Sequence, residues 1–407
     1  MAVLRQSLEQ STHQPDEAAL RLVVAAGGTG GHVQPAVATL RALRRRAAVD
    51  AIWIGSSTGI ERSAAEALAI PFARIQTGKL RRYFSLQTPL DAVRIPIGTG
   101  QAYRILRRFR PDVVLSTGGF VSVPTVVAAW ALGVPVLTHE QTAVTGLATR
   151  INARFADVIA LSHAASVAKL GTTRGEVIVT GNPVRDELLH GDAERARLTF
   201  GLGEDLPIIY VTGGALGAHA INEAMRHALP HMLAFAQVIH QCGPESVNGD
   251  LTRLRQAAAA LPDTLRARYV LRETLRDELA DVYAAATLVI GRAGAGTVSE
   301  LAVLGKPSIL IPLPGAGGDE QTANASTLAT HHAAVLLPQS ELTPERLIAD
   351  VRALLSEPDR LAMMGARARE VGRPDAAEHL ATAVLDLART KGLVQRSQTT
   401  LGPQARG

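Results

Sequence analysis

Four glycine-rich turns in the chain could bind an anion. They occupy residues 27–31, 118–119, 213–217 and 294–296, and each lies at the end of an apolar run. A glycine turn that opens a helix exposes backbone N–H groups, and the helix dipole favours a negative charge there. Glycine also lets a phosphate or a sugar approach the backbone closely. For each turn taken alone, the alternative is a tight connection without a ligand.

Four polar side chains at predicted strand ends and helix starts could do chemistry. His32 ends the first turn, where the helix dipole keeps its imidazole neutral and able to act as a general base; a capping or packing role is the alternative. Glu140 could be a second base, a charge stabiliser, a ligand of a sugar hydroxyl, or an acid at a helix N-terminus. Arg185 could bind a phosphate or stay solvated. Glu300 could accept two hydrogen bonds from a ribose diol or compensate the helix dipole.

The familiar phosphate-binding motifs are absent. No GxxxxGK[ST] string follows a predicted strand, and the GxGxxG fingerprint fails because Val33 stands at its third glycine position. The single cysteine, Cys242, cannot build a disulfide framework or a cysteine-based zinc site, and no metal-binding acidic pair is evident. Aromatic residues make up 3% of the chain, which argues against a stacking platform for nucleic acid. The expected ligand is therefore a phosphate-bearing molecule, with no metal, cofactor or nucleic acid.

The elements that position these residues form two similar halves. Strands are expected at 21–26, 51–55, 112–120, 134–142, 156–162 and 176–185, and the pattern restarts with strands at 207–214, 236–243, 269–273, 287–296 and 308–314. Helices are expected at 33–46, from Ile221 and around 297–304. Alternating strands and helices predict parallel sheets flanked by helices, with ligands beyond the carboxyl ends of the strands. The predicted fold class is therefore α/β, with two doubly wound parallel-sheet domains that face a cleft.

The chain is expected to divide into two domains joined by a linker. Residues 186–206 are rich in charge and interrupted by glycines, which favours a linker. The predicted parts are an N-terminal tail (1–20), an N-terminal domain (21–185), the linker (186–206), a C-terminal domain (207–376), a helix returning to the N-terminal domain (377–390) and a polar tail (391–407).

The charge is unevenly distributed between the two halves. Residues 1–180 hold 20 Lys and Arg against 11 Asp and Glu, a net charge of +9, whereas residues 181–407 carry −4. No signal peptide or membrane span is evident, because the most apolar window, 121–137, is short and contains Pro124, Gly133 and Pro135. The basic half could face nucleic acid, an acidic lipid surface or a phosphorylated substrate, and composition alone does not choose among them. The clusters Arg44–Arg46, Lys79–Arg82 and Arg104–Arg110 could each attract an anionic lipid surface, or they could be solvated helix ends.

Eight motifs follow one another in the order found in one family. They are GGTGGH (27–32), TGKLRRYFS (77–85), TGGF (117–120), HEQT (139–142), GNPVR (181–185), GGALGA (213–218), RAGAGTVSEL (292–301) and DEQTANA (319–325). From about residue 21 to 390 the chain resembles the MurG-type transferases, which add N-acetylglucosamine to lipid-linked muramoyl-pentapeptide. The resemblance implies the GT-B fold of inverting glycosyltransferases, with two Rossmann-like domains.

The resemblance also implies roles for individual residues. UDP-N-acetylglucosamine (UDP-GlcNAc) would bind mainly to the C-terminal half, with loop 213–217 at the diphosphate, 295–300 at the ribose and phosphate, and Gln321 at the sugar. The lipid-linked acceptor would enter through the N-terminal half, docked peripherally on the cytoplasmic face of the cell membrane. His32 is the candidate catalytic base, with Glu140 second. The candidate substrate-binding residues are Thr29, Gly30, Gly31, Gly118, Gly119, Thr142, Arg185, Gly214, Ala215, Gly217, Ala295, Gly296, Thr297, Val298, Ser299, Glu300 and Gln321.

Two positions depart from the family pattern. Ala215 replaces the usual serine, which removes a hydroxyl expected at the diphosphate, and Thr142 stands where the family often has an Asn- or Asp-type residue. Two alternatives therefore stay open. One is another GT-B enzyme, such as a glycolipid glycosyltransferase or a UDP-GlcNAc 2-epimerase, and the other is a non-catalytic UDP-sugar-binding protein.

Overall fold

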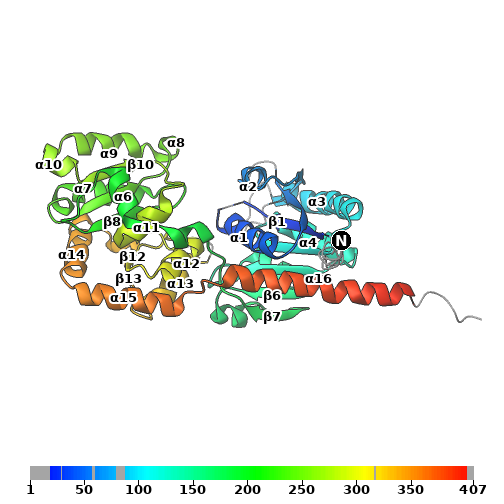
Figure 1. The fold of residues 1–407 in the computed structure, drawn as a ribbon. Helices are drawn as coiled ribbons and strands as arrows, with labels where there is room; N and C mark the ends of the chain where they lie inside the picture. Colours follow the sequence, from blue (N-terminus) through cyan, green and yellow to red (C-terminus); the bar gives the residue numbers. More distant parts are fainter. Residues whose placement is uncertain (1–18, 29, 57–59, 79–87, 316–317, 401–407) are drawn as a thin grey trace, which may run out of the picture.

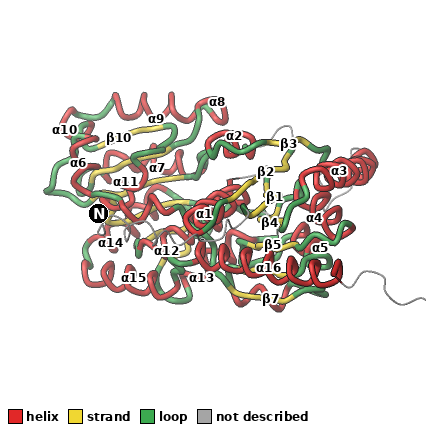
Figure 2. Tube along the Cα trace, turned by 45° about the vertical axis from the view of Figure 1, so that its right-hand side comes forward, coloured by secondary structure: helices red, strands yellow, loops and turns green. Residues whose placement is uncertain are grey.

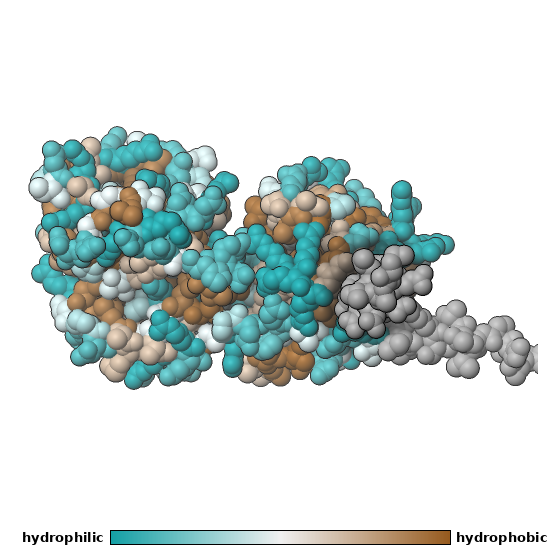
Figure 3. Space-filling view, in the orientation of Figure 1, coloured by the Kyte–Doolittle hydropathy of each residue, from teal (hydrophilic) through white to brown (hydrophobic). Residues whose placement is uncertain are grey.

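The computed structural model describes residues 19–28, 30–56, 60–78, 88–315 and 318–400. It shows two α/β lobes side by side (Figure 1), and the surface is hollowed between them (Figure 3). Each lobe contains one fully parallel sheet with helices on both faces, so the predicted fold class is confirmed.

The N-terminal sheet has seven strands in the order β3-β2-β1-β4-β5-β6-β7. In chain order they are β1 (Leu20–Ala26), β2 (Val49–Gly55), β3 (Phe72–Arg74), β4 (Val113–Gly118), β5 (Val136–Glu140), β6 (Val158–Leu161) and β7 (Glu176–Val179). Its helices are α1 (Gly30–Arg46), α2 (Glu61–Ala67), α3 (Thr88–Phe109), α4 (Ser122–Ala131) and α5 (Leu147–Asn152), with a 3-10 turn η1 (Ala164–Lys169).

The C-terminal sheet has six strands in the order β10-β9-β8-β11-β12-β13. They are β8 (Ile208–Thr212), β9 (Gln237–Gln241), β10 (Tyr269–Arg272), β11 (Ala286–Gly291), β12 (Ser308–Leu310) and β13 (Ala334–Leu336). The accompanying helices are α6 (Ala193–Phe200), α7 (His219–Met232), α8 (Glu245–Asn248), α9 (Asp250–Ala259), α10 (Asp263–Arg266), α11 (Leu279–Ala285), α12 (Ala295–Leu304), α13 (Glu320–Ala329), α14 (Pro344–Leu355) and α15 (Pro358–Val371), with turns η2 (Asp186–His190) and η3 (Gln339–Glu341).

Each sheet has a hydrophobic core on both faces, because alternate side chains of its central strands point to opposite faces. In β1, Leu22 and Val24 pack under α1, whereas Val23 and Ala25 pack under α3 and α4. In the second sheet, Ile208 and Tyr210 face α11 and α12, and Ile209 and Val211 face α7 and α14. Successive side chains of a strand point to opposite faces, so a strand covered on both sides must be apolar throughout.

The four glycine turns follow the four strands at the sheet centres. Both strand orders reverse once, between β1 and β4 and between β8 and β11, which is the switch point where doubly wound sheets bind ligands. The turns at 27–31 and 118–119 lie after β1 and β4, and those at 213–217 and 294–296 lie after β8 and β11. The topology therefore places one pair of turns at the switch point of each lobe.

Two predicted boundaries need correction. Residues 186–206 were expected to form a linker, but Leu188, Ala196 and Leu202 are buried in the core of the C-terminal lobe, so η2 and α6 belong to that lobe. A helix at 377–390 and a polar tail from 391 were expected, but α16 (Ala376–Thr400) is one helix that continues into the tail.

The chain passes between the lobes twice, and the two connections lie together. A Cβ placed on Gly181 would be 2.6 Å from the Cβ of Arg373, so the segment after β7 contacts the segment before α16. From there α16 crosses under the N-terminal lobe (Figures 1 and 2), where Leu380, Ala381 and Val384 join the core formed by α1.

Candidate functional site

The first glycine turn lies above a buried carboxylate. Glu61, at the start of α2, is fully buried and accepts hydrogen bonds from the backbone N–H of Gly28 at 3.3 Å and from Ser56 N at 2.9 Å. A Cβ on Gly27 would lie 2.7 Å from the Glu61 carboxylate, so this position has no room for a side chain. The sequence analysis missed Glu61, because nothing in its local pattern indicates a contact 33 residues away.

His32 lies between the first two glycine turns. Its Nδ1 is 3.1 Å from the carbonyl oxygen of Thr117, and the Thr117 hydroxyl donates to the His32 carbonyl at 2.6 Å. Gly118 and Gly119 have φ values of +91° and +79°, which suit glycine. A Cβ on Gly118 would lie 3.0 Å from His32 Nδ1, and one on Gly119 would lie 2.2 Å from Gly27 O. These glycines let the second turn pack against the first and against the imidazole.

Two groups contact Nδ1 of His32. Burial lowers the pKa of His32 and the nearby Glu140 carboxylate opposes that shift, so the ring is neutral near pH 7. With the proton on Nδ1, the ring donates to Thr117 O, and Nε2, which has no partner among the residues that the structure describes, can accept a proton. The Gln141 amide also contacts Nδ1, and Gln141 Oε1 has no partner among the described residues.

Glu140 organises the loop that follows β5. Its buried carboxylate accepts hydrogen bonds from Thr142 N at 3.1 Å, the Thr142 hydroxyl at 2.8 Å and Gly146 N at 2.9 Å. Three donors on one carboxylate hold the loop in a single conformation. The loop also reaches the other lobe, where Ala143 N donates to Asn324 Oδ1 at 3.0 Å.

In the C-terminal lobe, the turn after β8 leaves donors free. Gly214 N donates to Thr212 Oγ1 at 3.1 Å and Gly217 N to Gly214 O at 3.1 Å. The exposed residues Ala215 and Leu216 have no backbone N–H partner within the described part of the chain. Two free donors just before the N-terminus of α7 form a favourable place for an anion.

The residues Ala295 to Glu300 form the first turns of α12. Gly294 precedes this helix without a side-chain cap, and the first N–H groups of a helix have no intrahelical partner. Val298 is buried in the core, and the Ser299 hydroxyl donates to Ala295 O at 2.9 Å and accepts from Asn182 Nδ2 of the other lobe at 3.1 Å. Ala295, Gly296 and Thr297 thus offer the open end of the helix, whereas Val298 and Ser299 support it.

Glu300 is held by the connection between the lobes and by α11. Arg185 Nη2 donates to Glu300 Oε1 at 2.9 Å, and the Tyr283 hydroxyl donates to Glu300 Oε2 at 3.0 Å. Burial acts to lower the pKa of Arg185, but the Glu300 carboxylate outweighs it and raises that pKa, so the guanidinium keeps its charge. The sequence analysis named Arg185 and Glu300 separately and missed both their contact and Tyr283.

Gln321 lies at the start of α13 with its amide oriented by backbone groups. Its Oε1 accepts from Ala293 N at 3.3 Å and from Leu313 N at 3.0 Å. The oxygen is therefore occupied, and Nε2 has no partner among the residues described, which leaves a donor for a ligand.

The remaining predicted residues have clear places. Gly30 and Gly31 form the first turn of α1, and Gly217 packs so closely on Cys242 O that a Cβ there would lie at 1.9 Å. Thr29 lies outside the described residues. The candidate residues of the N-terminal lobe lie around His32, and those of the C-terminal lobe lie around the starts of α7, α12 and α13. Three hydrogen bonds link these two groups of residues or the connection between them: Arg185–Glu300, Asn182–Ser299 and Ala143–Asn324.

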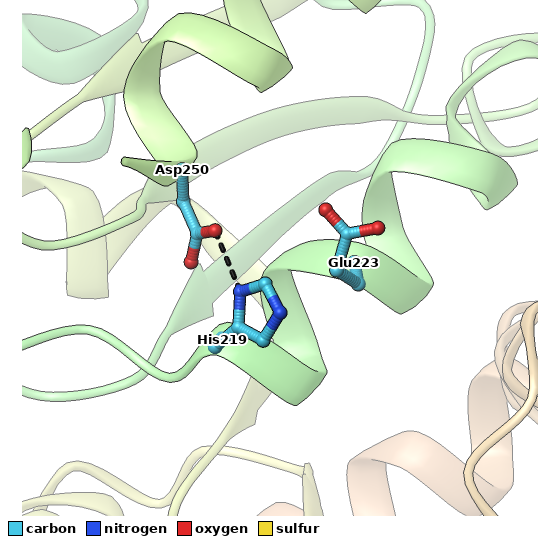
Figure 4. A group of neighbouring side chains, drawn as sticks. All are labelled: His219, Glu223 and Asp250. Carbon is cyan, nitrogen blue, oxygen red and sulfur yellow. Dashed lines mark hydrogen bonds and ion pairs between the residues drawn. The ribbon is translucent and has the colours of Figure 1, made fainter. Parts of the chain in front are cut away.

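One cluster of possible metal ligands was not anticipated. His219, Glu223 and Asp250 lie together at the start of α7 (Figure 4), with ligand atoms within 4.8 Å of one another. Each already has a partner: Asp250 accepts from His219 Nδ1 at 2.7 Å and from Asn222 Nδ2 at 2.7 Å, and Glu223 accepts from Arg226 at 2.9 Å. The contacts of Asp250 hold α9 to α7, and Glu223 is paired within α7, so the cluster has a structural explanation.

The comparisons with known proteins cover both lobes. Residues 22–161 match the glycosyltransferase family 28 N-terminal domain, and residues 208–380 match the glycosyltransferase family 28 C-terminal domain. Two relatives carry the name UDP-N-acetylglucosamine–N-acetylmuramyl-(pentapeptide) pyrophosphoryl-undecaprenol N-acetylglucosamine transferase. The protein from Treponema pallidum is 39% identical over 80% of this chain and 85% of its own length, and that from Desulforudis audaxviator is 35% identical over 91% and 99%.

Solved structures agree with these matches to glycosyltransferase family 28 and to the N-acetylglucosamine transferases. MurG of Acinetobacter baumannii has a TM-score of 0.69 at 30% identity and covers 90% of this chain and 99% of its own. A UDP-GlcNAc 2-epimerase from Neisseria meningitidis has a TM-score of 0.64 over 91% of this chain and 100% of its own, but at 14% identity it shows the fold alone. The expected GT-B architecture and the resemblance drawn from the eight motifs are confirmed. The chain belongs to glycosyltransferase family 28, within the MurG family of UDP-GlcNAc-dependent transferases.

Proposed function

We propose that the chain transfers N-acetylglucosamine from UDP-GlcNAc to the 4-hydroxyl of lipid-linked muramoyl-pentapeptide, with inversion at the anomeric carbon. The observation that carries this proposal is that the two sheets have glycine turns at their switch points and that the loop beside His32 contacts the C-terminal lobe directly, through Ala143–Asn324. The names of relatives that match nearly the whole chain support the choice of substrates.

The C-terminal lobe supplies the donor site in this proposal. The free N–H groups of Ala215 and Leu216 and the first turn of α12 stabilise the diphosphate, whose negative charge grows as the bond to the sugar breaks. Glu300 binds the ribose diol, and the free Nε2 of Gln321 donates to a sugar hydroxyl. Such donors are fixed before the reaction and need no reorganisation when the charge develops.

His32 is the base that fits this site best. Its ring is neutral and oriented by Thr117 O, so Nε2 can accept the proton of the attacking hydroxyl. Glu140 is the weaker candidate, because its two oxygens already accept three hydrogen bonds that hold the loop. In the proposed mechanism the carboxylate of Glu140 orders the loop and stabilises positive charge that develops on His32.

The N-terminal lobe provides a surface suited to a membrane. On α3 the side chains of Arg104, Arg107 and Arg108 are exposed and have no ion-pair partner among the described residues, and Tyr103 is exposed beside them. Trp130, at the end of the adjacent helix α4, is 47% exposed and packs edge-on against Phe155. Exposed aromatic and basic side chains together favour peripheral contact with anionic lipid at the cytoplasmic face of the membrane.

The other predicted basic clusters contribute differently. Arg45 and Arg46 pair with Glu378 of α16, and Arg44 donates to Leu68 O, so the cluster at 44–46 is engaged within the protein. Lys79–Arg82 lies outside the described residues. No helix in the described part of the chain is both long and apolar enough to cross a bilayer.

The decisive test is a transfer assay with purified protein, UDP-GlcNAc and the lipid-linked acceptor. The proposal expects a product that carries one added N-acetylglucosamine and stoichiometric release of UDP. Incubation without acceptor separates the alternatives, since a 2-epimerase consumes the sugar nucleotide alone and a binding protein leaves it unchanged. Folded protein that turns over neither pair of substrates would contradict the proposal.

A further inference from the structure

The Glu300 carboxylate is held by two donors from different parts of the molecule. Arg185 reaches Oε1 from the connection between the lobes, and Tyr283 reaches Oε2 from α11 at 3.0 Å. The Glu300 side chain is 14% exposed and Tyr283 is 2% exposed, so this contact is shielded from water. With both oxygens held, the carboxylate cannot rotate freely.

This arrangement leaves room for a diol. A carboxylate offers about four lone-pair sites, two on each oxygen. Arg185 and Tyr283 occupy one site on each oxygen, so each oxygen can still accept one hydrogen bond. Two adjacent acceptors in a fixed plane match the paired hydroxyls of a ribose.

Tyr283 is itself held in place. Its ring packs edge-on against Tyr210, with centroids 5.3 Å apart and planes at 88°, and the Tyr210 hydroxyl donates to Gln241. Lys306 Nζ donates to Ala284 O at 3.0 Å and Ala286 O at 3.1 Å, which fixes the end of α11 directly after Tyr283. Burial and the adjacent carboxylate raise the pKa of Tyr283, so its hydroxyl remains a donor.

We propose that Tyr283 is a positioning residue for donor binding, which orients the Glu300 carboxylate toward the ribose diol of the sugar nucleotide. The proposal rests on the role of Glu300 in the proposed function. It predicts that the Tyr283 hydroxyl contributes more to the binding of a nucleotide with both ribose hydroxyls than to the binding of one that lacks the 2′-hydroxyl, which has only one hydroxyl left for Glu300.

The test compares UDP with 2′-deoxy-UDP by calorimetry, without acceptor. Tyr283→Phe removes only the hydroxyl and is expected to weaken UDP binding about fivefold, with the binding of 2′-deoxy-UDP changed less than twofold. Tyr210→Phe is the matched control, because it removes the neighbouring hydroxyl that serves Gln241, and its preference for UDP should equal that of the wild type. In a Glu300→Ala background, Tyr283→Phe should have no further effect on UDP affinity.

Several outcomes would overturn the proposal. These are an unchanged UDP affinity in Tyr283→Phe, an equal loss for both nucleotides, or a wild-type protein that does not distinguish them. In transfer assays the KM for UDP-GlcNAc should rise with kcat preserved, whereas a general structural defect would lower kcat as well. A wild-type protein that distinguishes the nucleotides but transfers no sugar would contradict the proposed function and leave the role of Tyr283 supported.

Discussion

Ala143 of the N-terminal lobe and Asn324 of the C-terminal lobe are joined by a hydrogen bond of 3.0 Å from backbone N–H to side-chain oxygen. The loop that contains Ala143 is held by Glu140, and Asn324 lies one turn of α13 after Gln321. Asn324 Nδ2 also donates to Ala293 O at 3.2 Å, in the turn that leads into α12. One buried amide thus connects the loop beside His32 with two elements of the proposed donor site.

Replacing Asn324 should uncouple these elements. Asn324→Leu keeps the volume similar but leaves Ala143 N–H and Ala293 C=O without their partner in a buried place. Each such group costs about 1–3 kcal/mol, so the free energy of unfolding should fall by about 2 kcal/mol or more, and kcat should fall with it. Denaturant unfolding and transfer assays measure both quantities. Thr330→Ala, at the exposed end of the same helix, is the control, and equal stability of the two variants would refute the assigned role.

The second prediction concerns His32 as the base. His32→Ala should lower kcat by about 10²–10⁴-fold, because general-base catalysis contributes on that scale. The Kd for UDP should change less than threefold, since the contacts of His32 lie in the N-terminal lobe. His32→Asn keeps an amide that can donate to Thr117 O without a proton-accepting nitrogen, and it should be as slow as the alanine variant. Turnover within tenfold of the wild type in either variant would remove His32 from the mechanism.

Much of the fold could be predicted because the central strands are covered on both faces. Runs such as RLVVAA and PIIYVTGG are apolar throughout and end in glycine, which is the pattern of a buried parallel strand. Helix starts were less certain: α1 begins at Gly30 and α7 at His219, two or three residues before the predicted positions. The two glycines that open α1 disfavour a helix, and helix ends are in any case defined only to within one or two residues.

The contacts within the site could not be predicted in the same way. Glu61 under the first turn, Tyr283 on Glu300 and Asn324 on Ala143 are separated by 33, 17 and 181 residues from their partners. The hydrophobic periodicity of a sequence predicts which face of a helix or strand is buried. It does not predict which distant polar group contacts that helix or strand. Arg45 shows the same limit, because its partner Glu378 is 333 residues away. The sequence left this cluster as either a lipid contact or a solvated helix end and did not indicate that it pairs with α16.

The third prediction is a loss of stability in mild acid. Burial lowers the pKa of His139 to about 4 and that of His240 to about 3, against about 6.5 in an unfolded chain. Between these limits the unfolded state binds the proton and the native state does not, so the unfolding free energy falls as the pH falls from 6.5 toward 4. Each residue contributes at most about 1.4 kcal/mol per pH unit.

Denaturant titrations from pH 7 to pH 4 measure this slope. His139→Gln and His240→Gln should each have a shallower slope than the wild type, even where they are less stable at pH 7. His227→Gln, at an exposed position on α7, should keep the wild-type slope. Parallel curves for all four proteins would show that the two buried histidines do not carry the acid sensitivity.

The fourth prediction concerns the basic surface of α3. Arg104→Ala with Arg108→Ala removes two exposed charges, each worth about 1 kcal/mol near an anionic membrane, so binding to vesicles with anionic lipid should weaken about 30-fold. Sedimentation with vesicles measures the affinity, and added salt should reduce the difference. Arg360→Ala with Arg367→Ala, on α15 of the other lobe, is the matched control and should bind like the wild type. Equal losses in the two double variants would mean that net charge, and not this surface, attracts the lipid.

The last prediction concerns Ala215, where the resemblance to the family leads us to expect serine. Its side chain is exposed in the turn before α7, so a hydroxyl can be added there without disturbing the core. If this turn binds the diphosphate, Ala215→Ser adds a hydrogen bond to a charged group, which contributes about 1.5 kcal/mol and lowers the Kd for UDP about tenfold. Uridine has no phosphate, so its affinity should be the same in both proteins. Calorimetry with the two ligands separates the possibilities: a gain for UDP alone places the diphosphate at this turn, and an unchanged Kd for UDP would place it elsewhere.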